Sequence, residues 1–151
     1  MKMNASTDYA IRMLIYLAEK DGIVSSTVIS RHLLISKRYL HLIGSKLRDA
    51  DLIKVTHGSG GGYQLITNPS EITLYDIIML MEGTTFFVSS VTLLGEEKPK
   101  NNSLNSIYQL LQSLLSELLS EISLDTIIRK IPEENRHFVL ERFTQHLFTL
   151  L

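Results

Sequence analysis

Apolar residues recur at helical spacing in the first twenty residues of the chain. Within residues 4–19 they fall three or four apart, at positions such as Ala10, Met13 and Leu17. This period places them on one face of an α-helix. Gly22 follows shortly afterwards and is typical of a helix end. The pattern therefore predicts a first helix over residues 4–19 with one buried face.

Two shorter helical patterns follow and are separated by a tight turn. They run over residues 27–33 and residues 37–49, and each is preceded by serine. Serine is a preferred N-cap residue because its hydroxyl accepts a hydrogen bond from a free backbone amide. In the later segment Leu40, Ile43 and Leu47 form the apolar face, which leaves polar residues for the other face. Two helices joined by such a turn are typical of a helix-turn-helix unit.

The pattern changes to β-type after the third helix. Residues 52–56 and 63–67 are rich in β-branched and aromatic side chains, and four glycines lie between Thr56 and Tyr63. Two such runs around a glycine-rich loop predict a β-hairpin. Helix, turn, helix and hairpin in this order predict a winged helix. The expected fold class is mainly α with a small β-hairpin wing (α+β).

The second half of the chain is predicted to be helical around one irregular segment. We expect a linking helix over residues 72–81, a loop over residues 84–102 and the longest helix over residues 103–124. The apolar face of this last helix is wide, which favours packing on its own domain and also on a second subunit. The expected dimerisation residues are Leu104, Ile107, Leu111, Leu114, Leu118 and Ile122.

These patterns divide the chain into two regions. Residues 1–70 are expected to form a winged helix-turn-helix region, and residues 71–151 the linking helix, the loop and a helical dimerisation region. Shorter helical patterns at residues 125–129 and 133–150 suggest no role beyond packing or dimer support.

Charge is distributed unevenly along the chain, although the formal net charge is only −1. Residues 1–68 contain nine basic and five acidic residues, whereas the remainder contains six basic and eleven acidic ones. A basic first part on an otherwise acidic chain indicates a nucleic-acid-binding module. The chain has no cysteine, which excludes disulfides, thiol catalysis and thiolate-bound metals. No apolar run approaches the roughly 18 residues of a membrane span, so we expect a cytoplasmic protein.

The predicted DNA-contacting residues lie in the third helix, in the wing and at the start of the first helix. Basic side chains there would neutralise phosphates or contact guanine, and wing glycines let the backbone approach DNA closely. The third helix contributes Ser36, Lys37, Arg38, Tyr39, His41 and Lys46; the wing contributes His57, Gly58, Ser59, Gly60 and Gly61; the first helix contributes Ser6 and Thr7.

Three of these assignments leave an alternative open. Tyr39 falls at core spacing with Ile43 and can equally be a packing residue. Ser6 and Thr7 can cap the first helix instead of binding a phosphate. Lys46 can be an ordinary surface lysine.

Several motifs together resemble the Rrf-two family of bacterial winged-helix regulators. They are D-Y-A-I-R-M-L-I-Y-L-A, I-S-K-R-Y-L, S-K-L-R-D-A-D-L-I, G-S-G-G-G-Y-Q-L and E-I-T-L-Y-D-I-I followed by M-E-G, in this order over residues 1–83. The resemblance implies a homodimeric DNA-binding transcriptional regulator, usually a repressor, whose long helix is the dimerisation helix.

The sequence departs from the family pattern at three places. Many members hold an iron–sulfur cluster with three cysteines before the long helix, and residues 86–102 contain none. The chain therefore resembles the cluster-free members, which respond to a partner protein or another signal, and we expect no cofactor. The family usually has arginine before the wing glycines and often an acid after the third-helix Tyr-Leu, where this chain has His57 and His41. These two changes indicate a different operator and weaker binding.

Enzymatic and metal-binding functions are not favoured. The carboxylates show no paired arrangement for acid–base catalysis, and no serine nucleophile stands with a base. Histidine pairs nine residues apart do not share a helix face, which argues against a metal site unless two subunits combine ligands. Two rivals remain: a small-molecule sensor with a pocket near Phe86 and Phe87, and a partner-protein module that has lost operator binding.

Overall fold

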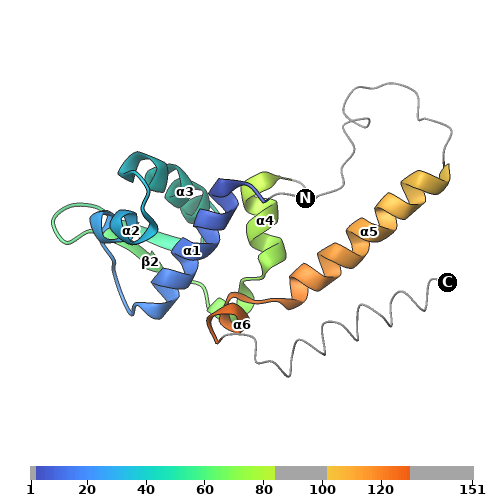
Figure 1. Ribbon diagram of the computed structural model, residues 1–151. Coiled ribbons are helices and arrows are strands. Elements are labelled where there is room, and N and C mark those ends of the chain that lie inside the picture. The colour runs from blue at the N-terminus through green and yellow to red at the C-terminus, as the bar shows by residue number, and fades with distance from the viewer. Residues whose placement is uncertain (1–2, 84–101, 130–151) are drawn as a thin grey trace.

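The computed structural model describes residues 3–83 and 102–129, with side chains from residue 106 onward in the second segment (Figure 1). The loop predicted over residues 84–102 lies almost wholly outside the described residues. The helix predicted over residues 133–150 and the pocket around Phe86 and Phe87 also lie outside them.

The winged helix predicted from the sequence is confirmed. Helix α1 spans Ala5–Glu19, α2 spans Ser26–Leu33 and α3 spans Lys37–Asp49, and the hairpin consists of β1, Ile53–Thr56, and β2, Gly62–Leu65. The hairpin is antiparallel, and its register pairs Ile53 with Leu65 and Thr56 with Gly62. A short 3-10 turn, Pro69–Glu71, then leads to α4, Leu74–Glu82, which is followed by α5, Asn102–Glu121, and α6, Leu124–Ile128.

Serine hydroxyls fix where α2 and α3 begin, as the sequence predicted. Ser25 accepts a hydrogen bond from the backbone N–H of Val28, and Ser36 accepts one from that of Tyr39. Between the two helices Leu34 adopts a left-handed conformation, with φ 56° and ψ 38°. This residue turns the chain sharply, so that a connection of only three residues joins α2 to α3.

The core forms around α1, with helices from both halves of the chain packed on it. Met13, Leu14 and Leu17 of α1 are fully buried or nearly so, together with Ile77 of α4 and Leu124 of α6. These residues belong to one apolar cluster that also includes residues of α2, α3 and the hairpin. Residue 70 therefore marks no break in the core.

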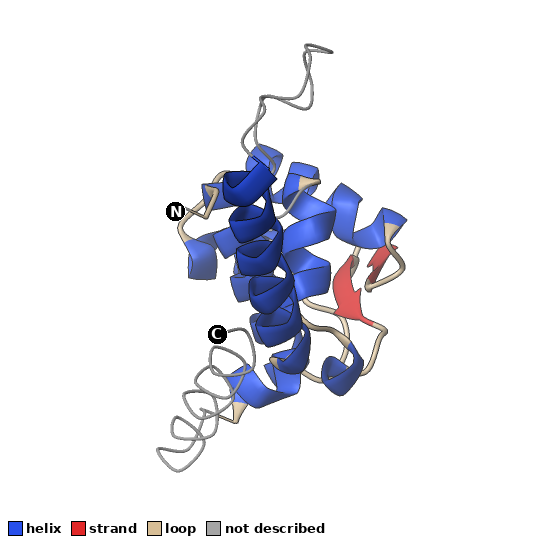
Figure 2. Cartoon of the chain, turned by 90° about the vertical axis from the view of Figure 1, so that its right-hand side faces the viewer, coloured by secondary structure: helices blue, strands red, loops and turns tan. Residues whose placement is uncertain are grey.

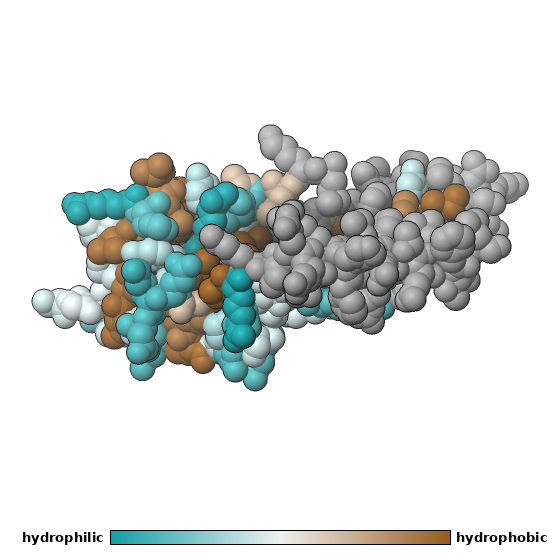
Figure 3. Space-filling view, turned by 60° about the horizontal axis from the view of Figure 1, so that its bottom comes forward, coloured by the Kyte–Doolittle hydropathy of each residue, from teal (hydrophilic) through white to brown (hydrophobic). Residues whose placement is uncertain are grey.

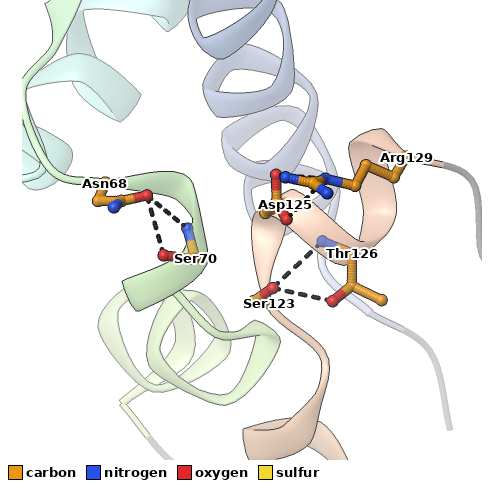
Figure 4. A network of polar contacts seen from close by, with 6 residues as sticks. All are labelled: Asn68, Ser70, Ser123, Asp125, Thr126 and Arg129. Atoms are coloured by element: carbon orange, nitrogen blue, oxygen red, sulfur yellow. Dashed lines mark hydrogen bonds and ion pairs between the residues drawn. The ribbon is translucent and has the colours of Figure 1, made fainter.

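The long helix predicted over residues 103–124 is interrupted, and this expectation was wrong at its C-terminal end. Helix α5 ends at Glu121, and the chain then passes beside the segment before α4: the N–H of Leu74 donates to the carbonyl of Ile122 at 2.9 Å, and the N–H of Leu124 donates to that of Ile72 at 2.7 Å. Ser123 caps α6 by accepting a hydrogen bond from Thr126 (Figure 4). The break lets Leu124 enter the core, which a continuous helix would prevent.

Helix α5 lies apart from the winged helix. It packs on α4 and extends away from the other helices (Figure 1), and it lies in front of them in Figure 2. Among the described helices, none combines the length and the apolar character that a membrane crossing needs.

Candidate nucleic-acid interface

The first turn of α3 presents two basic side chains to solvent. Lys37 and Arg38 are exposed, and neither has an ion-pair partner among the described residues. By contrast Arg12, Arg48 and Arg129 each lie within 3 Å of an aspartate oxygen. Two cations without carboxylate partners at a helix start leave their charge available to an anion.

A histidine and a tyrosine join α3 to the wing. His41 of α3 and Tyr63 of β2 form a hydrogen bond between Nδ1 and the phenol oxygen at 2.6 Å. The bond uses one ring nitrogen, and Nε2 has no partner among the described residues. Burial raises the pKa of the Tyr63 phenol, although the positive charge of Arg48 acts in the opposite direction. The neutral phenol is thus favoured at physiological pH.

The Tyr63 ring fits against α3 because residue 44 has no side chain. A Cβ built on Gly44 would lie 2.6 Å from Cε1 of the Tyr63 ring. Glycine in a helix interior costs about 1 kcal/mol relative to alanine, and this contact explains why the chain carries it. A lone glycine inside a helical pattern is the sequence signal for such a close packing contact.

The base of the wing is held on two sides. Tyr63 exchanges backbone hydrogen bonds with Val24, at 2.8 and 2.9 Å, so the segment before α2 pairs with β2. A Cβ on Gly62 would lie 2.1 Å from the Val24 carbonyl oxygen. The hairpin is therefore fixed to the helix-turn-helix on one side and paired with β1 on the other.

The tip of the wing is exposed and narrow. His57, Gly58, Ser59 and Gly60 are all exposed, and Gly58 and Gly60 have φ of 93° and 84°. Gly61 lies at the foot of the loop, where its N–H donates to the Gly58 carbonyl at 3.0 Å. The wing residues predicted from the sequence thus lie on one surface loop beside α3.

A hollow of about 260 Å³ lies between α3 and the wing. Its lining includes His41, Ser45 and Arg48 from α3 and His57 from the wing. The two elements that the sequence singled out therefore form one concave surface with nitrogen donors on both sides.

Three residues predicted to contact DNA instead have side-chain contacts with other parts of the protein. The Thr7 side chain is fully buried and donates from Oγ1 to Oε1 of Glu82 at 2.7 Å, so its expected surface position was wrong. Lys46 donates from Nζ to the Met81 carbonyl at 3.0 Å, at the end of α4. Tyr39 is half-buried and packs edge-on against the Tyr9 ring, with centroids 5.9 Å apart.

The backbone at the start of α1 is bound by Glu82 of α4. Asn4 is the N-cap, and its own side chain makes no capping hydrogen bond. The Glu82 carboxylate instead accepts from the Asn4 N–H at 3.1 Å. Ser6 is half-buried within the first turn and does not cap the helix. The Glu82 carboxylate therefore lies at the start of α1, where the sequence suggested a bound phosphate. Its negative charge disfavours the binding of another anion there.

All the residues expected to form the dimer interface except Ile122 lie on α5. Ile107 and Leu111 are exposed, with 51% and 39% of their surfaces accessible, and Leu114 and Leu118 are half-buried. The side chain of Leu104 lies outside the described residues, and Ile122 follows the end of the helix.

No group of three or more histidine, cysteine, aspartate or glutamate side chains within the described residues could hold a metal ion. The chain has no cysteine at all, so thiolate ligands for an iron–sulfur cluster are missing from its whole length. The donor set therefore does not fit such a cluster.

Comparisons with known proteins agree with this architecture. The family model Rrf2, described as an iron-dependent transcriptional regulator, matches residues 3–130. The transcriptional regulator CymR of Bacillus subtilis is 36% identical over 106 residues, which cover 69% of this chain and 75% of the relative.

Solved structures of relatives give the same result. The structure of CymR, the global cysteine regulator of B. subtilis, is similar with a TM-score of 0.68 and 30% identity, and the match covers 87% of this chain and 99% of that one. The structure of IscR from T. potens matches with a TM-score of 0.67 and 28% identity over 89% of this chain and 90% of that one. These relatives are named as regulators and not as enzymes. The chain belongs to the Rrf2 (Rrf-two) family of transcriptional regulators.

Proposed function

We propose that this protein is a homodimeric, DNA-binding transcriptional repressor that works without an iron–sulfur cluster in the cytoplasm. The observation that carries the proposal is the position of Lys37 and Arg38. Both are exposed at the start of α3 and lack carboxylate partners among the described residues. Phosphate neutralisation by such cations supplies much of the affinity of DNA-binding proteins.

The arrangement suits a duplex laid across α3 and the wing. The first turns of α3 would enter a major groove, with Ser36 and Arg38 near base edges or phosphates. The wing residues 57–61 would lie in or beside the adjacent minor groove, where glycine permits close backbone approach. His57 and His41 both line the hollow, and their rings would add hydrogen-bonding groups at the edge of the contact.

The apolar stripe of α5 supports the homodimer. Ile107 and Leu111 expose large apolar surfaces on a helix that packs on α4. A second copy related by a two-fold axis would bury this stripe against its own equivalent. The two winged helices of the dimer would then be held at a fixed spacing and would recognise an imperfect inverted repeat.

A cluster-free regulator needs another signal. Because the chain lacks cysteine, we infer that its signal is a partner protein or a small molecule. The rival with a small-molecule pocket depends on Phe86 and Phe87, which lie outside the described residues. The other rival, a protein-binding module without an operator, predicts no DNA sequence preference at any salt concentration.

The test is selection of DNA sequences from a random pool by the full-length protein, followed by titration of the selected site. We expect an enriched inverted repeat, and Arg38→Ala to weaken binding by about tenfold or more and to reduce the salt slope by about one. Arg129→Ala is the matched control, because Arg129 directly follows α6 and forms an ion pair with Asp125. A pool without an enriched repeat would contradict the proposal.

A further inference from the structure

One leucine is exposed in the middle of α3. Leu42 has 63% of its surface accessible, although leucines at the neighbouring positions Leu40 and Leu47 are completely buried. It belongs neither to the core cluster nor to the partly buried residues packed against that cluster. Burial among the described residues therefore does not explain why position 42 is apolar.

Leu42 lies on the outward face of α3 beside the basic residues. It follows Arg38 by four positions and precedes Ser45 by three, so the three side chains are neighbours on one face. Every other exposed residue of α3 from Lys37 to Asp49 is polar or charged. Other large apolar residues are exposed elsewhere in the described residues, and Figure 3 shows such groups among polar ones on one face. Leu42 differs from them in lying on the helix proposed to read DNA.

The chemistry of the major groove offers one apolar group to such a side chain. Of the four DNA bases, only thymine presents a 5-methyl group in the major groove. The other base-edge groups that specify sequence there are hydrogen-bond donors and acceptors. Leucine neither donates nor accepts hydrogen bonds, so it would desolvate a polar base edge without replacing the bonds to water. Contact with the thymine methyl is the favourable alternative.

We propose that Leu42 is a specificity-determining residue that packs on the 5-methyl group of a thymine in each operator half-site. This inference rests on the proposed function. Four residues of helix correspond to roughly 6 Å along its axis, or about two base steps of roughly 3.4 Å. The thymine is therefore expected within about two base pairs of the nucleotide that Arg38 contacts.

Charge favours DNA over a protein surface as the occupant. Lys37 and Arg38 precede Leu42 by five and four positions, and the nearest acidic residue of α3 is Asp49, which is paired with Arg48. A second copy of the chain on this face would meet these unpaired cations with the same cations of its own. A DNA groove instead places phosphates beside them.

The experiment has two stages with full-length protein. The first is the selection that yields the operator, and it tests the proposed function by itself. In the second stage each thymine of the half-sites is replaced by deoxyuridine, which removes the methyl group and leaves the hydrogen-bonding edge unchanged. Affinity is measured by fluorescence polarisation for the wild type, Leu42→Ala and the control Ile66→Ala, whose residue is 54% exposed outside α3.

We expect one thymine position at which deoxyuridine weakens wild-type binding about fourfold per methyl group. Leu42→Ala should bind both DNAs equally, and Ile66→Ala should keep the wild-type difference. The inference is overturned if no thymine shows a methyl effect, if Leu42→Ala retains that effect, or if Leu42→Ala changes the oligomeric state in sedimentation. A selection that yields no operator overturns the proposed function, and this inference with it.

Discussion

The winged helix and α5 are stabilised in different ways. In the winged helix, Gly44 and Gly62 lie so close to other elements that a single added carbon would collide with them. Helix α5 packs on α4 and leaves Ile107 and Leu111 exposed on its other side. The wing is therefore fixed by close contacts within one chain, whereas we propose that α5 packs on a second subunit. Substitutions that act on one region and spare the other make this contrast measurable.

The largest effect is expected at the base of the wing. Gly62→Ala would place a Cβ 2.1 Å from the Val24 carbonyl, and backbone cannot move aside as a flexible side chain can. We expect a loss of about 3 kcal/mol or more in the free energy of unfolding, measured by urea denaturation. Gly60→Ala is the control, because open space surrounds Gly60 and its positive φ alone should cost about 1 kcal/mol. Equal losses would show that the close contact with Val24 does not hold the wing.

Charge on the apolar stripe of α5 should break the dimer without unfolding the monomer. Replacing both Ile107 and Leu111 by glutamate would bury unpaired charge in the proposed interface. We expect the dimer dissociation constant to rise about 100-fold or more, measured by sedimentation equilibrium. The control replaces Gln109 and Ser113 by glutamate, because both are exposed on another side of the same helix. A wild type that is monomeric, or a control that dissociates equally, would contradict the proposed interface.

A smaller effect is expected where α4 meets the start of α1. Thr7→Val keeps the shape of a fully buried side chain but removes the hydroxyl that donates to Glu82. We expect a loss of about 2 kcal/mol in thermal or urea unfolding, because the carboxylate loses a charge-assisted hydrogen bond. Ser6→Ala should change stability by less than about 0.5 kcal/mol. If Thr7→Val were neutral, the hydrogen bond to Glu82 would contribute nothing measurable.

The contact between α3 and the wing should contribute less. Tyr63→Phe removes the hydroxyl that is bonded to His41 and keeps the ring on Gly44. We expect a loss of about 1 kcal/mol and a weaker affinity for the operator, because the wing is less firmly oriented. Tyr16→Phe is the control, since the Tyr16 hydroxyl has no hydrogen bond within the described residues. Identical results for the two variants would exclude a role for this hydrogen bond.

The smallest effect is a dependence of stability on alkaline pH. Burial raises the pKa of Tyr63 in the folded protein, so the unfolded chain loses this phenol proton first as pH rises. Stability from this group is fully present below about pH 10 and is lost as pH rises through the higher folded value. Tyr63→Phe should therefore flatten the fall in the urea midpoint above about pH 10. A fall of the same steepness in both proteins would rule out this contribution.

Local patterns in the sequence were enough to predict the winged helix. The period of Leu40, Ile43 and Leu47, the cap at Ser36 and the glycine loop each act within a few residues, and the structure places them as expected. The end of α5 was predicted wrongly because the apolar pattern continues smoothly through Leu124. Backbone bonds to residues about fifty positions earlier decide where that helix stops.

Part of the candidate site could also be predicted from the local sequence. The exposed positions of Lys37, Arg38 and the wing follow from local spacing and turn chemistry. The hydrogen bonds of Thr7 and Lys46 could not be predicted, because their partners lie on α4, 75 and 35 residues away in sequence. Tertiary structure decides which polar side chains are hydrogen-bonded within the protein. The periodicity of the sequence does not reveal these bonds.

The contact of Gly44 with Tyr63 restricts how this protein can change over evolutionary time. A larger residue at position 44 would require a smaller one at position 63, because the two occupy one shared volume. Each change alone would pass through a destabilised intermediate, with either a clash or a cavity. Mutations at the two positions are therefore expected to arise together, and a wing transplanted from a relative would need residue 44 of its own α3.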